Sequence, residues 1–167
     1  MALTDFTTYD DIRAALGVSS EEIEAATISL PVYEFSLQGE LEDVDSTLNL
    51  IPDFATVVET APGLRTAAQS RFFQATYLFA TYAVARHLTS SLPLFSPKEV
   101  TDGKASVVRY AQDPYERTIE RVEKLYEKQR VKLAEAYAAF KTTSVAAPVR
   151  RVFFVTSAIA TDPVTGA

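Results

Sequence analysis

The sequence predicts an all-α protein, a helical bundle around two long helices at about residues 64–91 and 113–141. The first segment has no internal glycine or proline and is apolar on most sides, which is typical of a central helix. The second carries one apolar stripe at helical spacing, so we expect it to pack along the first. The two helices would be joined by an extended loop. We divide the chain into a helical domain, 1–143, and an extended C-terminal arm, 144–167.

The N-terminal region predicts short helices. In residues 9–16, Thr8 can cap the first turn, and Asp10 and Asp11 lie where the helix dipole favours negative charge. Gly17 suits the left-handed position that ends many helices. We therefore expect a short helix that ends at this glycine.

A second helix is expected to begin at Ser19 or Ser20 and to end before Pro31. Ser19 and Glu22 are three residues apart, as a capping box requires. The apolar positions of this helix are Ile23, Ala26 and Leu30.

Residues 31–43 fit either a helix or a strand. Val32 and Phe35 are at helical spacing, whereas the alternation of apolar residues around them also suits a strand, and Gly39 weakens a helix. We favour the helix. A further helix is expected over residues 47–60, although a proline interrupts it.

A long connection occupies residues 92–112. Asp102-Gly103 is a turn signal, and the β-branched and polar residues that follow suit a short extended piece or a hairpin arm. A loop of this length in a compact domain is usually functional or disordered.

Asp113 and Pro114 form a strong start for the last long helix, as the cap and the first helical residue. Its apolar stripe consists of Ile119, Val122, Leu125, Tyr126, Leu133, Tyr137 and Phe140. Beyond this helix, residues 152–155 form a β-prone apolar run, which would be an aggregation liability in a free tail unless a partner covered it.

Catalytic and metal-binding patterns are missing from the sequence. The chain has no cysteine and a single histidine, His87, which lies in an apolar helix and fits a structural role better than a catalytic one. The five glycines are isolated, so no phosphate-binding loop is predicted. We expect no enzymatic activity, no metal and no cofactor. No apolar run reaches 18 residues, so no transmembrane helix is expected either.

Charge is distributed unevenly along the chain. Residues 1–60 hold 13 acidic residues and one basic residue, whereas residues 61–167 hold 9 acidic and 15 basic residues. The simpler interpretation is a solvated acidic face. The alternative is that the acidic part of one copy meets the basic part of another, as in a head-to-tail ring. An acidic wall would also let DNA pass without binding it.

The order of these segments is similar to that of a known family. Residues 9–18 (YDDIRAALGV), followed by residues 19–23 (SSEEI), resemble the opening of the head–tail connector (adaptor) proteins of tailed bacteriophages. The helix at 64–91 resembles the family's central helix, and residues 99–110 resemble the loop before its last long helix. The resemblance covers roughly residues 5–141.

This resemblance implies a structural virion protein without enzymatic activity. It would form a ring, typically of twelve copies, that joins the portal protein to the tail or nozzle protein and continues the DNA channel. Its location would be the neck of the virion, after assembly in the host cytoplasm, with no membrane involved.

The resemblance also implies that extended arms bind the neighbouring virion proteins. The arm expected to bind the portal contains Arg150, Arg151, Val152, Phe153, Phe154 and Val155. The loop expected to face a neighbouring copy or a tail protein contains Asp102, Gly103, Lys104, Arg109 and Tyr110. The alternative is a free-standing helical adaptor or regulatory protein that binds a single protein partner.

Overall fold

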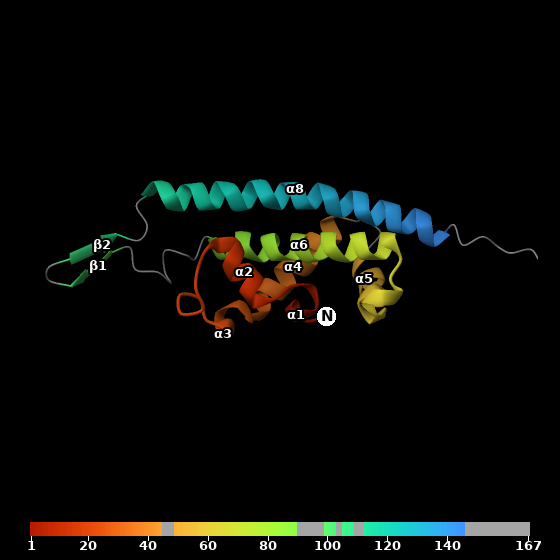
Figure 1. Cartoon of the computed structure of the whole chain (residues 1–167), viewed down its shortest axis with the longest axis horizontal. Helices are drawn as coiled ribbons and strands as arrows, with labels where there is room; N and C mark the ends of the chain where they lie inside the picture. The colour runs from red at the N-terminus through yellow and green to blue at the C-terminus, as the bar shows by residue number, and fades with distance from the viewer. Residues whose placement is uncertain (45–48, 90–98, 103–104, 109–111, 146–167) are drawn as a thin grey trace, which may run out of the picture.

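The structure of the chain is a computed structural model. It describes residues 1–44, 49–89, 99–102, 105–108 and 112–145, with side chains over 1–44, 49–89 and 116–143. Two long helices, α6 (Ala67–Thr89) and α8 (Gln112–Val145), run antiparallel side by side, and the shorter helices surround the rest of α6 (Figure 1). The predicted all-α class with two long helices is therefore confirmed.

The remaining described elements are short. In chain order they are α1 (Leu3–Phe6), α2 (Tyr9–Leu16), α3 (Ala25–Ile28), α4 (Pro31–Val44), α5 (Leu50–Glu59), the 3₁₀ turn η1 (Pro62–Leu64), and the strands β1 (Glu99–Asp102) and β2 (Ala105–Val108). None of the helices described is long and apolar enough to cross a membrane.

Helix α2 has the ends that its sequence predicts. The Thr8 hydroxyl accepts a hydrogen bond from the Asp11 backbone N–H (3.2 Å), and Gly17 adopts the left-handed conformation at φ 75°. Ile12 and Leu16 are buried one turn apart, so the apolar face of this short helix packs into the core.

The single helix predicted after Ser19 is wrong. A turn comes first, and only the four residues of α3 are helical, because the backbone is extended at Glu24 (ψ 151°). The Ser19 N–H does donate to the Glu22 carboxylate (2.7 Å), which is one half of the predicted capping box. The Arg13 guanidinium of α2 donates a hydrogen bond to the Ile23 carbonyl oxygen (2.8 Å). This tertiary contact satisfies a carbonyl group that would accept a backbone hydrogen bond in a continuous helix.

Helices α4 and α5 confirm the helical interpretation of the ambiguous region. Helix α4 buries Tyr33, Leu37 and Leu41, which are four residues apart and line one face. Pro52 falls in the first turn of α5, where backbone N–H groups have no partner within the helix, so the proline does not break it.

Both long helices begin at slightly different residues from those predicted. Helix α6 begins at Ala67 because Thr66 and Gln69 form a capping box, each side chain accepting from the other's backbone N–H (3.2 and 2.8 Å). Helix α8 begins at Gln112, so Asp113 lies in its first turn instead of capping it. It continues to Val145, beyond the predicted end at about 141.

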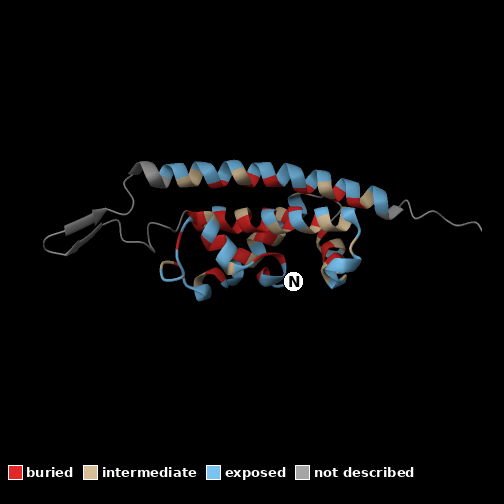
Figure 2. Ribbon diagram, in the orientation of Figure 1, coloured by how far each residue is buried: buried red, intermediate tan, exposed pale blue. Residues whose placement is uncertain are grey.

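The core lies where α6 meets α8 and the shorter helices (Figure 2). The Phe72 ring packs against Tyr137 and Phe140, with centroids 5.1 Å apart in both pairs, and meets Phe54 of α5 edge-on at 5.9 Å. Most of the predicted stripe of α8 is buried, whereas Ile119 and Leu125 at its sides are partly exposed. Burial of these large aromatic surfaces contributes to the stability of the bundle.

The predicted extended loop contains an antiparallel hairpin. Strand β1 pairs with β2 from Glu99 opposite Val108 to Asp102 opposite Ala105. Figure 1 shows the hairpin beside the start of α8, standing off the helical bundle.

Candidate functional site

Most of the residues expected to bind partners lie outside the described part of the chain. This holds for the whole arm, Arg150, Arg151, Val152, Phe153, Phe154 and Val155, and for Gly103, Lys104, Arg109 and Tyr110 of the loop. Asp102 alone is placed, as the last residue of β1. The candidate surfaces must therefore come from the helical bundle and from the backbone of the hairpin.

His87 is part of an ionic cluster between α4 and α6. Its Nε2 lies 2.8 Å from Glu40 Oε1, and Arg86 Nη1 lies 3.6 Å from the same oxygen. The Glu40 side chain is only 14% exposed, so the contact with His87 and the charge of Arg86 offset the loss of its hydration. The cluster joins α4 to α6, so His87 contributes to the packing of these two helices.

Tyr126 of α8 completes this cluster. The Arg86 guanidinium lies over its ring, 4.7 Å from the centroid. Burial raises the pKa of the Tyr126 phenol, and the negative charge of Glu40 raises it further. The phenol is therefore neutral at physiological pH and serves as a packing group.

Two further polar contacts join helices. Tyr137 of α8 donates a hydrogen bond to Asp53 of α5 (2.7 Å), and Lys141 pairs with the same carboxylate (2.5 Å). Asp11 of α2 accepts hydrogen bonds from Thr8 and from Tyr77 of α6, and these two bonds lower the pKa of its carboxyl group. Each of these contacts connects two helices, and Asp11 and Tyr77 also line a groove between α2 and α6.

Metal chemistry has no support in the described residues, where no three histidine, cysteine, aspartate or glutamate side chains gather closely enough to hold an ion.

An open groove of about 350 Å³ lies between α6 and α8. Its lining comes from Arg71, Gln74, Ala75, Leu78, Gln129, Lys132, Glu135, Ala136 and Ala139. On α8, Ala136 and Ala139 are too small to fill the space, and Leu78 on α6 is left 41% exposed. The groove is thus an apolar depression with a polar rim, a shape that suits a protruding side chain of another protein.

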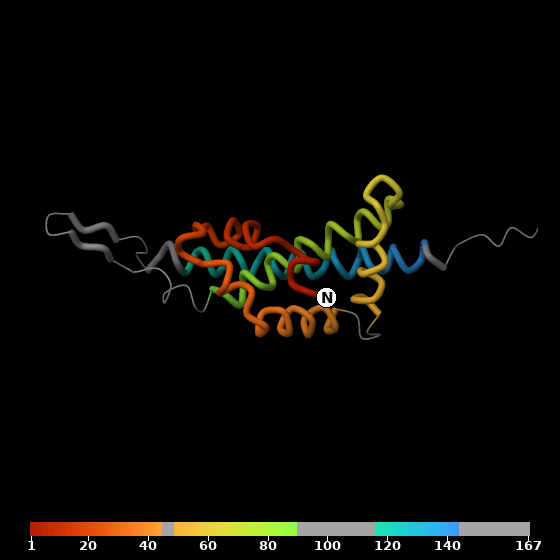
Figure 3. Tube along the Cα trace, turned by 90° about the horizontal axis from the view of Figure 1, so that it is seen from below, coloured from red at the N-terminus to blue at the C-terminus, as the bar shows by residue number. Residues whose placement is uncertain are grey.

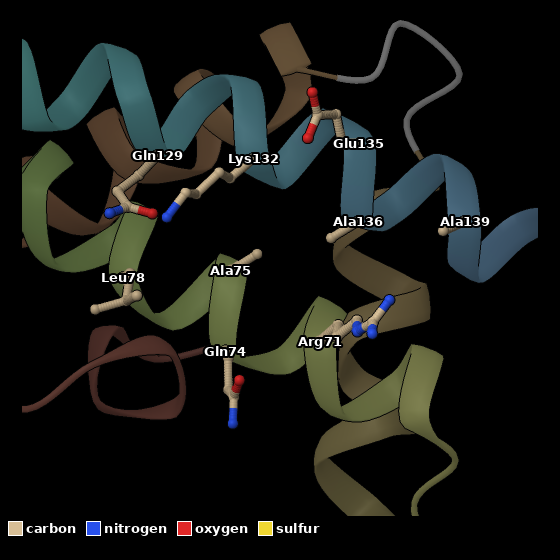
Figure 4. A pocket seen from close by; sticks show the side chains of 9 residues that line it. All are labelled: Arg71, Gln74, Ala75, Leu78, Gln129, Lys132, Glu135, Ala136 and Ala139. Carbon is tan, nitrogen blue, oxygen red and sulfur yellow. The ribbon is translucent and has the colours of Figure 1, made fainter.

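Figure 4 shows how the polar residues of this groove are arranged. Lys132 and Gln129 reach from α8 toward α6, Arg71 reaches from α6 toward α8, and Glu135 points away from α6. No ion pair is formed by Arg71 or Lys132 with any residue whose side chain is described. The groove therefore presents two cationic side chains to an incoming partner.

Gln129 is an unusual member of the groove lining. Only 7% of the residue is exposed, yet its Oε1 has no hydrogen-bond partner. A buried amide oxygen without a donor costs about 1–3 kcal/mol.

A smaller groove of about 250 Å³ continues the first across Leu78. It lies between α2 and α6 and is bordered by Ala14, Ala15, Tyr77 and Tyr82. Because Leu78 lines both grooves, the two form one hollowed surface on the same side of α6.

Helix α4 carries an exposed apolar surface. Phe35 is 68% exposed and Val32 57% exposed, and Leu30 just before the helix is 48% exposed. Gly39 lies one turn further along this side, and a Cβ added there would meet nothing within 4 Å. Glycine weakens a helix interior by about 1 kcal/mol relative to alanine, and no contact inside the described chain requires it.

The chain matches no protein-family model, no curated protein and no solved structure. The likeness to phage head–tail connectors therefore rests on the sequence pattern alone.

Sequence patterns could have revealed some of these features and not others. Gln129 lies three residues after Tyr126 and four before Leu133, which places it within the buried stripe of α8 by helical spacing. No sequence pattern indicated the outward position of Phe35. Its helical spacing from Val32 also fits a buried face.

Proposed function

We propose that this protein is a non-enzymatic assembly protein of the head–tail connector type. It forms a ring, typically of twelve copies, that joins a phage portal to the tail or nozzle and continues the DNA channel in the neck of the virion. Support comes from the resemblance of residues 5–141 to that family and from the all-α bundle around two long helices.

The observation that carries this proposal is the hairpin in the connection that joins α6 to α8. A two-stranded hairpin by itself is marginally stable in water. Strands β1 and β2 stand off the bundle in Figure 1, and within the described residues no third strand pairs with either of them. A neighbouring copy or a tail protein that pairs with the hairpin would stabilise it.

The other expected contacts belong to the same proposal. The arm from Arg150 to Val155 would bind the portal, and the loop from Asp102 to Tyr110 would face a neighbour or a tail protein. The acidic residues of the N-terminal third would line or flank a channel that DNA passes without specific binding.

The test is to replace residues 99–108 with a short glycine–serine linker and compare both proteins by electron microscopy. The intact chain is expected to form rings, alone or on the portal protein encoded by the same genome. The linker variant is expected to keep the helical bundle, measured by circular dichroism, and to lose the rings. A variant that forms normal rings would contradict the role of the hairpin.

The same images separate the alternative, a free-standing helical adaptor for a single partner. An intact chain that stays monomeric both alone and with portal would favour that adaptor.

A further inference from the structure

Two surfaces of the bundle differ in shape. One is the groove between α6 and α8, where Ala136 and Ala139 form a floor of small side chains. The other is the exposed side of α4, where Phe35 protrudes. A large apolar side chain and a depression floored by alanines are complementary shapes.

The two surfaces also differ in charge. Arg71 and Lys132 reach into the groove from its two walls (Figure 4). Glu42 and Asp43 are exposed on α4, and neither pairs with a cation among the residues whose side chains are described. This places opposite charges on the two surfaces, within the broader contrast between an acidic N-terminal third and a basic remainder.

The two surfaces lie on opposite sides of the molecule. Leu78 of α6 lines the groove, whereas His87 of α6 contacts Glu40 of α4. These two α6 residues are nine positions apart, which is two and a half turns of a helix and places them on opposite faces. Figure 3 agrees, since α2, which borders the groove side, and α4 lie on opposite sides of the α6–α8 pair.

We propose that the exposed side of α4 of one copy docks into the α6–α8 groove of the next copy. Phe35 covers the alanine floor near Ala139, and Glu42 pairs with Lys132. This inference deepens the proposed ring and rests on it, because it names which surfaces of adjacent copies meet.

The spacing of the residues fits this pairing. Phe35 and Glu42 are seven residues apart on α4, and Ala139 and Lys132 are seven residues apart on α8. Seven residues are close to two turns, so both pairs lie about 10 Å apart along one face of their helix. An antiparallel crossing of α4 and α8 at a shallow angle would then bring both contacts together.

One feature that is unexplained within one chain fits the same contact. Gly39 lies between Phe35 and Glu42, and its missing side chain would let the α4 backbone approach a neighbour closely.

The geometry leads to head-to-tail assembly. Each copy carries one protruding surface and one groove on opposite sides, so docking leaves one free surface of each kind at the ends of a chain of copies. Such an interface produces a ring when the rotation closes and a filament when it does not.

Disulfide trapping tests the contact directly, because the chain has no cysteine of its own. A Phe35→Cys variant is mixed with an Ala139→Cys variant under mild oxidation, and the matched control replaces Ala139→Cys by Ala138→Cys, the exposed neighbouring residue. The expected result is about tenfold more cross-linked dimer for the first mixture than for the control, since disulfide geometry is strict. Equal yields in the two mixtures would overturn the inference.

Complementation tests the direction of assembly. Phe35→Glu spoils the protruding surface and Ala139→Glu spoils the groove, with Val131→Glu and Ala138→Glu as exposed controls on α8. Each of the first two variants is expected to sediment as a monomer, and their mixture as a heterodimer that grows no further. Assembly of Phe35→Glu like the unaltered chain would contradict the proposed contact.

These outcomes separate the inference from the proposed function. Rings that persist in Phe35→Glu would leave the connector function standing and refute this interface. Specific trapping of Phe35→Cys with Ala139→Cys, without rings on portal, would support this interface and refute the connector function.

Discussion

The two sides of the α6–α8 pair differ in how they are packed. On the core side, Phe72, Tyr137 and Phe140 fill the space between the helices with stacked and tilted rings. On the other side, Ala136 and Ala139 leave a groove of about 350 Å³. The same two helices are therefore fully packed on one side and open on the other, and the open side is where another protein can complete the packing.

The largest expected effect tests the packed side. Phe72→Ala removes a fully buried ring and should lower the free energy of unfolding by about 3–5 kcal/mol, through lost burial and a residual cavity. The matched change Phe35→Ala, at a 68% exposed position, should alter it by less than about 0.5 kcal/mol. Urea denaturation of monomeric protein measures both. Equal losses would show that Phe35 belongs to the core.

A smaller loss is expected at the polar edge of the packed side. Tyr137→Phe removes the hydrogen bond to Asp53 while keeping the ring, and should lower the free energy of unfolding by about 1–2 kcal/mol. A double-mutant cycle with Asp53→Ala isolates the pair. Additive effects of the two changes would contradict a direct contact.

The exposed side of α4 gives an effect of opposite sign. Gly39→Ala should raise the free energy of unfolding of the monomer by about 0.5–1 kcal/mol, because alanine favours the helix and its Cβ meets nothing within 4 Å. The same change should weaken the association of copies, measured by sedimentation. A variant that is more stable and also associates more tightly would contradict close approach at this glycine.

The smallest effect concerns pH and lies at the smaller groove between α2 and α6, which Asp11 and Tyr77 line. Hydrogen bonds from Thr8 and Tyr77 lower the pKa of Asp11, so this carboxylate contributes stability above its unfolded pKa and loses it as pH falls through the lowered value. Asp11→Asn should therefore flatten the dependence of stability on pH below about pH 4. Identical acid profiles of the two proteins would refute the contribution of Asp11.

Local patterns predicted most of the fold. The caps at Thr8 and Gly17, the apolar length of α6 and the stripe of α8 are properties of single helices, and each was visible in the sequence. The segment after Ser19 was predicted wrongly because Arg13, which belongs to the preceding helix, donates a hydrogen bond to the Ile23 carbonyl oxygen and stabilises a turn. Local propensity does not contain that contact.

The candidate surfaces could be predicted much less well. The groove depends on how α6 and α8 rotate relative to each other, which decides whether their side chains fill the space between the helices or leave a depression. Phe35 and Val32 fit a buried face by spacing, and only the packing of Tyr33, Leu37 and Leu41 turns them outward. The predicted arm, from Arg150 to Val155, lies outside the described residues and stays a prediction.

The most direct test of the whole account is the mass of the full-length chain in solution, measured by sedimentation equilibrium alone and with portal protein. Assembly through paired surfaces predicts a discrete multiple of 18.3 kDa for the chain alone, or a complex that adds such a multiple to the mass of the portal, lost in Phe35→Glu and kept in Val131→Glu. A mass of 18.3 kDa at every concentration and with portal present would contradict it.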